Sequence, residues 1–169
     1  MANRDDLRSA VEALRNAGSP VVVAISGYGG SGKSTLVRDL VTAIPGSARL
    51  RGDDFLRDER FDQRSPDWDV VDRRRLRAAL DDQRATAASG TVLFVDAIGI
   101  LHPDLAGAFD LAVWVDVPLE VATARGAARD RAVGDDHDRL WNEVWAPNER
   151  DFDARFAPRA AADVLYEGD

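Results

Sequence analysis

The segment from Gly27 to Thr35 has the composition of a phosphate-binding loop. It reads Gly-Tyr-Gly-Gly-Ser-Gly-Lys-Ser-Thr and fits the pattern G-x-x-x-x-G-K-[ST]. Its glycines allow positive φ, so that successive backbone N–H groups can point toward one anion. Lys33 is the only lysine in a chain with 22 lysines and arginines, and a compact ammonium group fits between phosphates where a guanidinium group does not. The segment therefore predicts a site for the phosphates of ATP or a similar nucleotide.

The residue types of this loop also predict individual roles. We expect Lys33 to contact the β- and γ-phosphates and the hydroxyl of Ser34 to coordinate Mg²⁺. A helix that begins near Lys33 would direct the positive end of its dipole at the phosphates. The remaining nucleotide contacts are predicted for the other small residues of the loop, which are Gly27, Gly29, Gly30, Ser31, Gly32 and Thr35.

Such a loop must connect a buried strand to a helix, and the sequence provides both. Residues 20–26 (PVVVAIS) are a short, apolar, β-branched run that is typical of a strand buried on both faces. Residues 34–44 place their large apolar side chains on one helical face, and Pro45-Gly46 ends that pattern. Further strands are predicted at 48–52, 91–96, 111–117 and 163–166, and further helices at 5–16, at 72–88, from 118 onward and at 138–156. Strands that alternate with helices indicate an α/β fold with a parallel sheet covered on both faces.

Length and composition limit the possible classes of protein. The 169 residues suffice for one domain, which we expect to span 1–169. A formal net charge of −8 argues against a nucleic-acid partner. The absence of cysteine and of any apolar stretch of about 18 residues argues against a disulfide framework and a membrane partner. We therefore expect a cytoplasmic protein.

Acidic residues follow two of the predicted strands. Asp53 and Asp54 end the second strand, and Asp96 ends the third. Ligands of open α/β sheets bind at the carboxyl ends of the strands. Because side chains alternate along a strand, we expect only Asp53 to face the cleft and Asp54 to be solvated. The aromatic residues of the last predicted helix recur at helical spacing, which favours packing over base stacking; they are Trp141, Trp145, Phe152 and Phe156.

The order of these features resembles the uridine kinase family and its relatives, which include phosphoribulokinases, pantothenate kinases and nicotinamide riboside kinases. The resemblance rests on GYGGSGKST, Asp53-Asp54-Phe55, Trp68-Asp69, the acid that ends VLFVD and a later arginine-rich segment. It extends from Val21 to Tyr166. It implies a three-layer P-loop kinase fold whose five-stranded parallel sheet has the order 2-3-1-4-5.

The resemblance also implies roles for three acids. Asp53 matches the aspartate of a D-x-F motif, which acts as general base toward the acceptor hydroxyl and helps to organise magnesium. Asp96 takes the place of the acid near magnesium at the end of the third strand. Asp69 would hydrogen-bond the sugar hydroxyls of the acceptor, whereas Asp72 is well placed to cap the following helix.

The arginine-rich segment resembles the family's lid, which we expect around residues 125–138. Arg125 and Arg131 would bind ATP, and Arg129 would stabilise the charge of the transferred phosphoryl group. Arg125 and Arg129 are four residues apart and share one helical face.

The expected function is transfer of the ATP γ-phosphoryl group to a hydroxyl of a nucleoside-like or other small polar acceptor. One alternative is a kinase for nicotinamide riboside, another vitamin, a sugar or a nucleoside monophosphate, whose phosphate would need cationic groups such as Arg57, Arg60 and Arg64. Another is a module that binds ATP without transferring phosphate. Between Asp69 and Thr91 the chain has room for only one helix and a turn, so it lacks the insertion that closes over the nucleobase in full-length uridine kinases.

Overall fold

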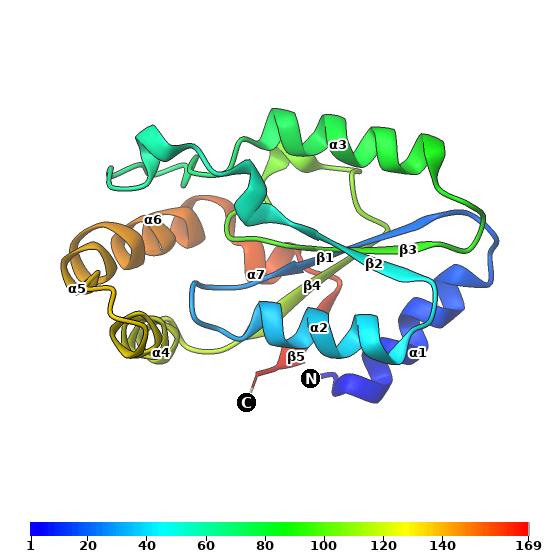
Figure 1. The fold of residues 1–169 in the computed structure, drawn as a ribbon, viewed down its shortest axis with the longest axis horizontal. Coiled ribbons are helices and arrows are strands. Elements are labelled where there is room, and N and C mark those ends of the chain that lie inside the picture. The colour runs from blue at the N-terminus through cyan, green and yellow to red at the C-terminus, as the bar shows by residue number, and fades with distance from the viewer. Residues whose placement is uncertain (169) are drawn as a thin grey trace.

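The computed structural model of the chain describes residues 1–168. Within them, five parallel strands form one sheet in the order β2-β3-β1-β4-β5 (Figure 1). The predicted α/β P-loop fold and its strand order are thereby confirmed. The strands are β1 (Val21–Ser26), β2 (Ser47–Arg51), β3 (Val92–Asp96), β4 (Leu111–Asp116) and β5 (Val164–Glu167).

The side chains of the central strand β1 point alternately into two hydrophobic cores. Val22 and Ala24 belong to one core, whereas Val21, Val23 and Ile25 belong to the other. Because successive side chains of a strand point to opposite faces, a strand between two cores must be apolar throughout. This explains why all six residues of β1 are buried.

Helices cover both faces of the sheet and complete the three layers (Figure 1). α1 (Arg4–Arg15) and α2 (Lys33–Ala43) pack on one face through residues such as Leu7 and Leu40. α3 (Arg73–Thr86) lies on the other face, where Leu76 and Leu80 are fully buried. Asp72 accepts a hydrogen bond from the backbone N–H of Arg75, as expected of the residue that caps α3. The remaining helices are α4 (Leu119–Ala132), α5 (Asp138–Leu140), α6 (Ala146–Phe156) and α7 (Pro158–Ala161).

The helix predicted at 138–156 is present but changes its winding. Residues Trp141–Trp145 form a π-helical turn between α5 and α6. Pro147 lies at the start of α6 and has no N–H to donate to the preceding turn, which accounts for the wider turn there. Trp141 and Trp145 are both buried, and their ring centroids lie 4.8 Å apart.

The strand predicted at 48–52 ends earlier than expected. β2 stops at Arg51, and Gly52–Phe55 form a 3₁₀ turn, so the alternation argument for Asp53 and Asp54 does not apply. Gly52 is required here because a Cβ atom would lie 2.1 Å from the Cβ of Ala97. The turn is therefore packed directly against the chain that leaves β3.

None of the helices in residues 1–168 is both long and apolar enough to span a membrane.

Candidate nucleotide-binding site

A cavity of about 580 Å³ lies at the carboxyl ends of β1 and β3. The phosphate loop forms one wall, and the turn after β2, the end of β3 and α4 contribute polar side chains. Aromatic and aliphatic side chains form the remaining wall, among them Leu56, Phe61, Trp68, Val70, Ile98, Trp141 and Trp145. The cavity thus joins a charged half to an apolar half, as sites for small molecules usually do.

The phosphate loop takes the backbone conformation that its glycines allow. Gly30 has φ +84° and Gly32 has φ +98°. A Cβ atom on Gly30 would lie 2.1 Å from the carbonyl oxygen of Ala122 in α4, so the loop can approach α4 only with glycine at this position. Gly32 precedes α2, and no side chain caps the N-terminus of that helix. Its first N–H groups are therefore suited to an anion.

Lys33 is buried within the curve of this loop. Its Nζ donates hydrogen bonds to the carbonyl oxygens of Gly27 (2.9 Å) and Tyr28 (2.7 Å). Burial lowers the pKa of Lys33, and the negative charges of Glu149, Asp96 and Asp53 oppose that effect. The ammonium group is therefore held by backbone carbonyls and by surrounding acids, at the place where phosphate oxygens would provide the opposite charge.

Ser34 and Asp96 form the pair expected on the magnesium side. The Ser34 hydroxyl donates to Oδ2 of Asp96 over 2.8 Å, and Asp96 is 5% exposed. A hydroxyl and a carboxylate fit Mg²⁺, which in such sites takes its other ligands from substrate phosphates and water. Arg49 of β2 also donates to both oxygens of Asp96, with its Nε 2.6 Å from Oδ1. Ser34 and Asp96 are the residues that would hold Mg²⁺ here, with Asp96 itself held by Arg49.

Asp53 lies at the rim of the cavity, together with the loop residues Lys33 and Ser34. Its side chain is 62% exposed and forms an ion pair of 3.6 Å with Arg51. Asp54 is also exposed but does not line the cavity. The structure thus brings Asp53, and not Asp54, to the phosphate loop.

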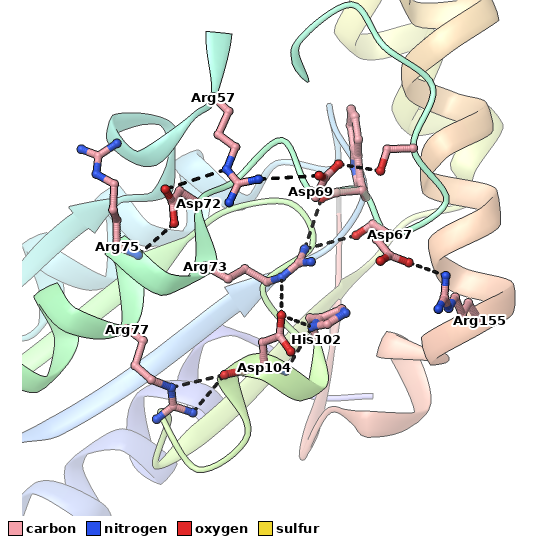
Figure 2. Close-up of polar contacts among 12 residues, drawn as sticks. Arg57, Asp67, Asp69, Asp72, Arg73, Arg75, Arg77, His102, Asp104 and Arg155 are labelled. Carbon is pink, nitrogen blue, oxygen red and sulfur yellow. Dashed lines mark hydrogen bonds and ion pairs between the residues drawn. The ribbon is translucent and has the colours of Figure 1, made fainter. Parts of the chain in front are cut away.

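Asp69 lies outside the lining of the cavity. It accepts a hydrogen bond of 2.5 Å from Ser65 and pairs with Arg60 (3.4 Å) and Arg57 (3.7 Å). Figure 2 shows Arg57 paired with the carboxylates of both Asp69 and Asp72. Burial raises the pKa of Asp69, but the hydrogen bond from Ser65 and the two arginines outweigh it, and the pKa lies below its usual value. In this conformation Asp69 orders the segment between β2 and α3.

The three predicted lid arginines take different positions. Arg125 and Arg129 of α4 line the cavity. Arg129 is paired with Asp130 over 2.8 Å. Arg131 points elsewhere and is paired with Asp138, so the structure does not bring it to the phosphate loop.

Glu149 is a site residue that we did not predict from the sequence. It comes from α6 and is 4% exposed, and its Oε1 accepts a hydrogen bond of 2.6 Å from the backbone N–H of Gly29 in the phosphate loop. Burial raises the pKa of Glu149 to about 7, against the opposing effects of Lys33 and the Gly29 N–H. A signal was available: Glu149 follows Trp145 by four residues and precedes Phe152 by three, so it shares their buried helical face.

Trp141 connects α4, α6 and the phosphate loop. Its Nε1 donates to Asp130 over 2.9 Å, and its ring occupies the space left by the missing side chains of Gly29 and Gly126. The aromatic residues of 141–156 are packed as predicted, and two of them, Trp141 and Trp145, also form a wall of the cavity.

A family model described as an AAA domain (AAA_33) matches residues 22–154 of this sequence. The chain belongs to this family. The part that matches the AAA domain model contains the phosphate loop, Asp53, Asp96, Arg125, Arg129 and Glu149. No curated protein matched the sequence.

Solved structures resemble this AAA domain over nearly its whole length. A protein from Silicibacter sp. TM1040, described as a candidate fructose transport system kinase, has a TM-score of 0.70 at 20% identity, with 94% of this chain and 98% of the other covered. A candidate uridine kinase from Bacillus stearothermophilus has a TM-score of 0.65 at 14% identity, with 95% and 99% covered. Shikimate kinase from Acinetobacter baumannii in complex with shikimate has a TM-score of 0.56 at 20% identity, with 94% and 88% covered. At these identities the likeness establishes the α/β P-loop fold alone.

Proposed function

We propose that this protein is an ATP-dependent kinase that transfers the γ-phosphoryl group to a hydroxyl of a small, nucleoside-like or similarly hydroxylated acceptor. The observation that carries the proposal is the meeting, in one cavity, of the loop around Lys33 with the acids Asp53 and Asp96. A site that only binds nucleotide has no need of a general base beside the phosphates. The names of the similar structures, which include kinases for uridine, fructose transport and shikimate, support an acceptor of this size and polarity.

In the proposed reaction, Lys33 and the N–H groups of the loop hold the β- and γ-phosphates. Asp53 takes the proton of the acceptor hydroxyl while the oxygen of that hydroxyl bonds to the γ-phosphorus. The bond between that phosphorus and the β–γ bridging oxygen breaks, and ADP leaves. Ser34 and Asp96 would hold Mg²⁺, which when bound neutralises charge on the phosphates. Arg125 and Arg129 would stabilise the charge on the transferred group.

A phosphorylated acceptor is a weaker alternative. The arginines that would bind its phosphate already have acidic or amide partners: Arg57 and Arg60 pair with Asp69, and Arg64 donates to Asn148 and Asp151. Binding a monophosphate there would require breaking these contacts.

A coupled ADP-release assay with uridine, fructose and shikimate as acceptors tests the proposal. We expect acceptor-dependent turnover that falls on the order of 10²-fold or more in Lys33→Ala and Asp53→Asn, since each removes a group that acts on the transition state. Asp54→Asn is the matched control, because Asp54 is the exposed neighbour outside the cavity, and it should leave turnover unchanged. ATP binding without turnover of any acceptor would instead indicate a nucleotide-binding module.

A further inference from the structure

Two buried polar atoms in the cavity have no hydrogen-bond partner among the described residues. One is Oε2 of Glu149 and the other is Nε1 of Trp68. Both side chains line the cavity and are less than 5% exposed. The Trp68 N–H lies close enough to the Glu149 carboxyl to lower its pKa, but the two groups do not meet the geometry of a hydrogen bond. Leaving such atoms unpaired is unfavourable, so their presence points to a missing ligand group.

Each of the two neighbouring side chains is held in place by contacts of its own. Glu149 is fixed to the phosphate loop through its other oxygen, which accepts from the Gly29 N–H at 2.6 Å. Trp68 has φ +44°, a conformation that is unfavourable for a bulky residue and that the surroundings must enforce. Arg73 donates to the carbonyl oxygens of Asp67 (3.2 Å) and Trp68 (3.4 Å) and so braces this turn, as Figure 2 shows for Arg73 and Asp67.

The chemistry of these atoms limits what can satisfy both. The indole N–H only donates, and a carboxylate oxygen only accepts. A hydroxyl group can accept from the first and donate to the second at once. A fully ionised phosphate or carboxylate of the ligand has no hydrogen to give, and it would be repelled by Glu149 when this carboxyl is ionised. Leu56, Val70 and Ile98 line the same cavity, and their apolar surface suits an uncharged carbon skeleton.

We propose that Glu149 and Trp68 form the acceptor subsite and bind a hydroxyl of a neutral, polyhydroxylated substrate beside the phosphate loop. This inference rests on the proposed kinase activity and narrows its acceptor to uncharged alcohols. It assigns acceptor binding to α6 and to the turn before α3, instead of to Asp69. Glu149 and Trp68 orient the acceptor, whereas Asp53 still takes the proton.

Paired probes that differ only in a phosphate test the subsite. Uridine is compared with uridine monophosphate and fructose with fructose 6-phosphate, each with Mg-ATP, in the ADP-release assay. For the wild type we expect turnover of a neutral probe and at least 10-fold lower kcat/KM for its phosphorylated partner. Glu149→Gln should raise KM for the neutral probe about 10- to 100-fold, because the amide presents a donor to the acceptor hydroxyl or leaves it unpaired. Trp68→Phe, which keeps the ring but removes the N–H, should raise KM with a smaller effect on kcat.

The control for the tryptophan substitution is Trp114→Phe. The Nε1 of Trp114 is also buried without a partner, but Trp114 does not line the cavity. This variant should keep the wild-type KM for the neutral probe. Binding of a non-hydrolysable Mg-ATP analogue, measured by calorimetry, should remain within about threefold of wild type in Trp68→Phe.

The outcomes separate the inference from the proposed function. Absence of both analogue binding and turnover in the wild type would overturn both. Turnover with an unchanged KM in Glu149→Gln, or a preference for the phosphorylated probe, would overturn the subsite and leave the kinase activity standing. The subsite would also be overturned if the wild type bound the ATP analogue but neither neutral probe was turned over or raised the melting temperature of the protein.

Discussion

At the scale of single residues, the main feature of the site is that two titratable side chains, Lys33 and Glu149, are buried. Lys33 is buried against backbone carbonyls, and Glu149 lies behind Gly29 with one oxygen unpaired. Burial acts on these two groups in opposite senses: it lowers the pKa of Lys33 and raises that of Glu149 to about 7. Both shifts disfavour the charged forms, which is the physical cost of burying charged groups away from water.

The pKa of Glu149 predicts a pH-dependent stability. The folded state binds the proton of Glu149 more tightly than the unfolded state, whose pKa is near 4.5. The contribution of this bound proton to the free energy of unfolding is therefore fully present below pH 4.5 and is lost as the pH rises through about 7. At about 1.4 kcal/mol per pKa unit, the free energy of unfolding should fall by at most about 3 kcal/mol across this range.

Urea unfolding of the wild type and of Glu149→Gln at several pH values measures this effect. All other titrating groups are common to the two proteins, so the difference between their free energies of unfolding isolates Glu149. We expect the wild type to lose stability relative to Glu149→Gln between pH 4.5 and 7.5. Parallel curves over this range would show that Glu149 titrates normally in the folded protein.

At the scale of secondary-structure elements, the site depends on close approach between α4, α6 and the phosphate loop. Glycines make this approach possible: Gly30 of the loop meets the carbonyl of Ala122, and Gly126 of α4 meets the ring of Trp141. Trp141 is tied back to α4 by its hydrogen bond to Asp130. The π-helical turn that contains Trp141 is thereby fixed against the loop, and Glu149 on the following helix is fixed with it.

Gly126→Ala tests this packing. In an exposed helix the substitution would stabilise by up to about 1 kcal/mol. Here the new Cβ would lie 2.3 Å from the Trp141 ring, so we expect a net destabilisation of about 1–3 kcal/mol. Thermal unfolding gives the change in stability, and tryptophan fluorescence reports the displaced ring. In a Trp141→Ala background the same substitution should cost little, and an equal cost in both backgrounds would show that the ring is not the cause.

At the scale of the whole molecule, the fold could be predicted from the sequence more completely than the functional site. The apolar run of residues 20–26, its glycine-rich continuation and the alternation of strands and helices determine a parallel sheet, and the resemblance supplied its order. The same local pattern located the phosphate loop. Asp53 and Asp96 were found because acids at strand ends reach the same edge of a parallel sheet.

The rest of the site depends on contacts between residues far apart in the chain. Glu149 lies 120 residues from Gly29, and Arg49 meets Asp96 only because β2 and β3 are neighbours in the sheet. No local spacing encodes either contact. The ion pairs of Asp69 and Arg131 likewise follow from how the segments between elements fold back on themselves.

Calorimetric titration with Mg-ATP tests the central claim, that the loop around Lys33 binds the nucleotide's phosphates. We predict one site per chain in the wild type and at least about 10-fold weaker binding in Lys33→Ala, since a charge-assisted hydrogen bond to phosphate is lost. Lys33→Arg should also weaken binding, because the planar guanidinium does not fit the curve of the loop. Absence of heat in the wild type, or equal affinity in Lys33→Ala, would contradict the account.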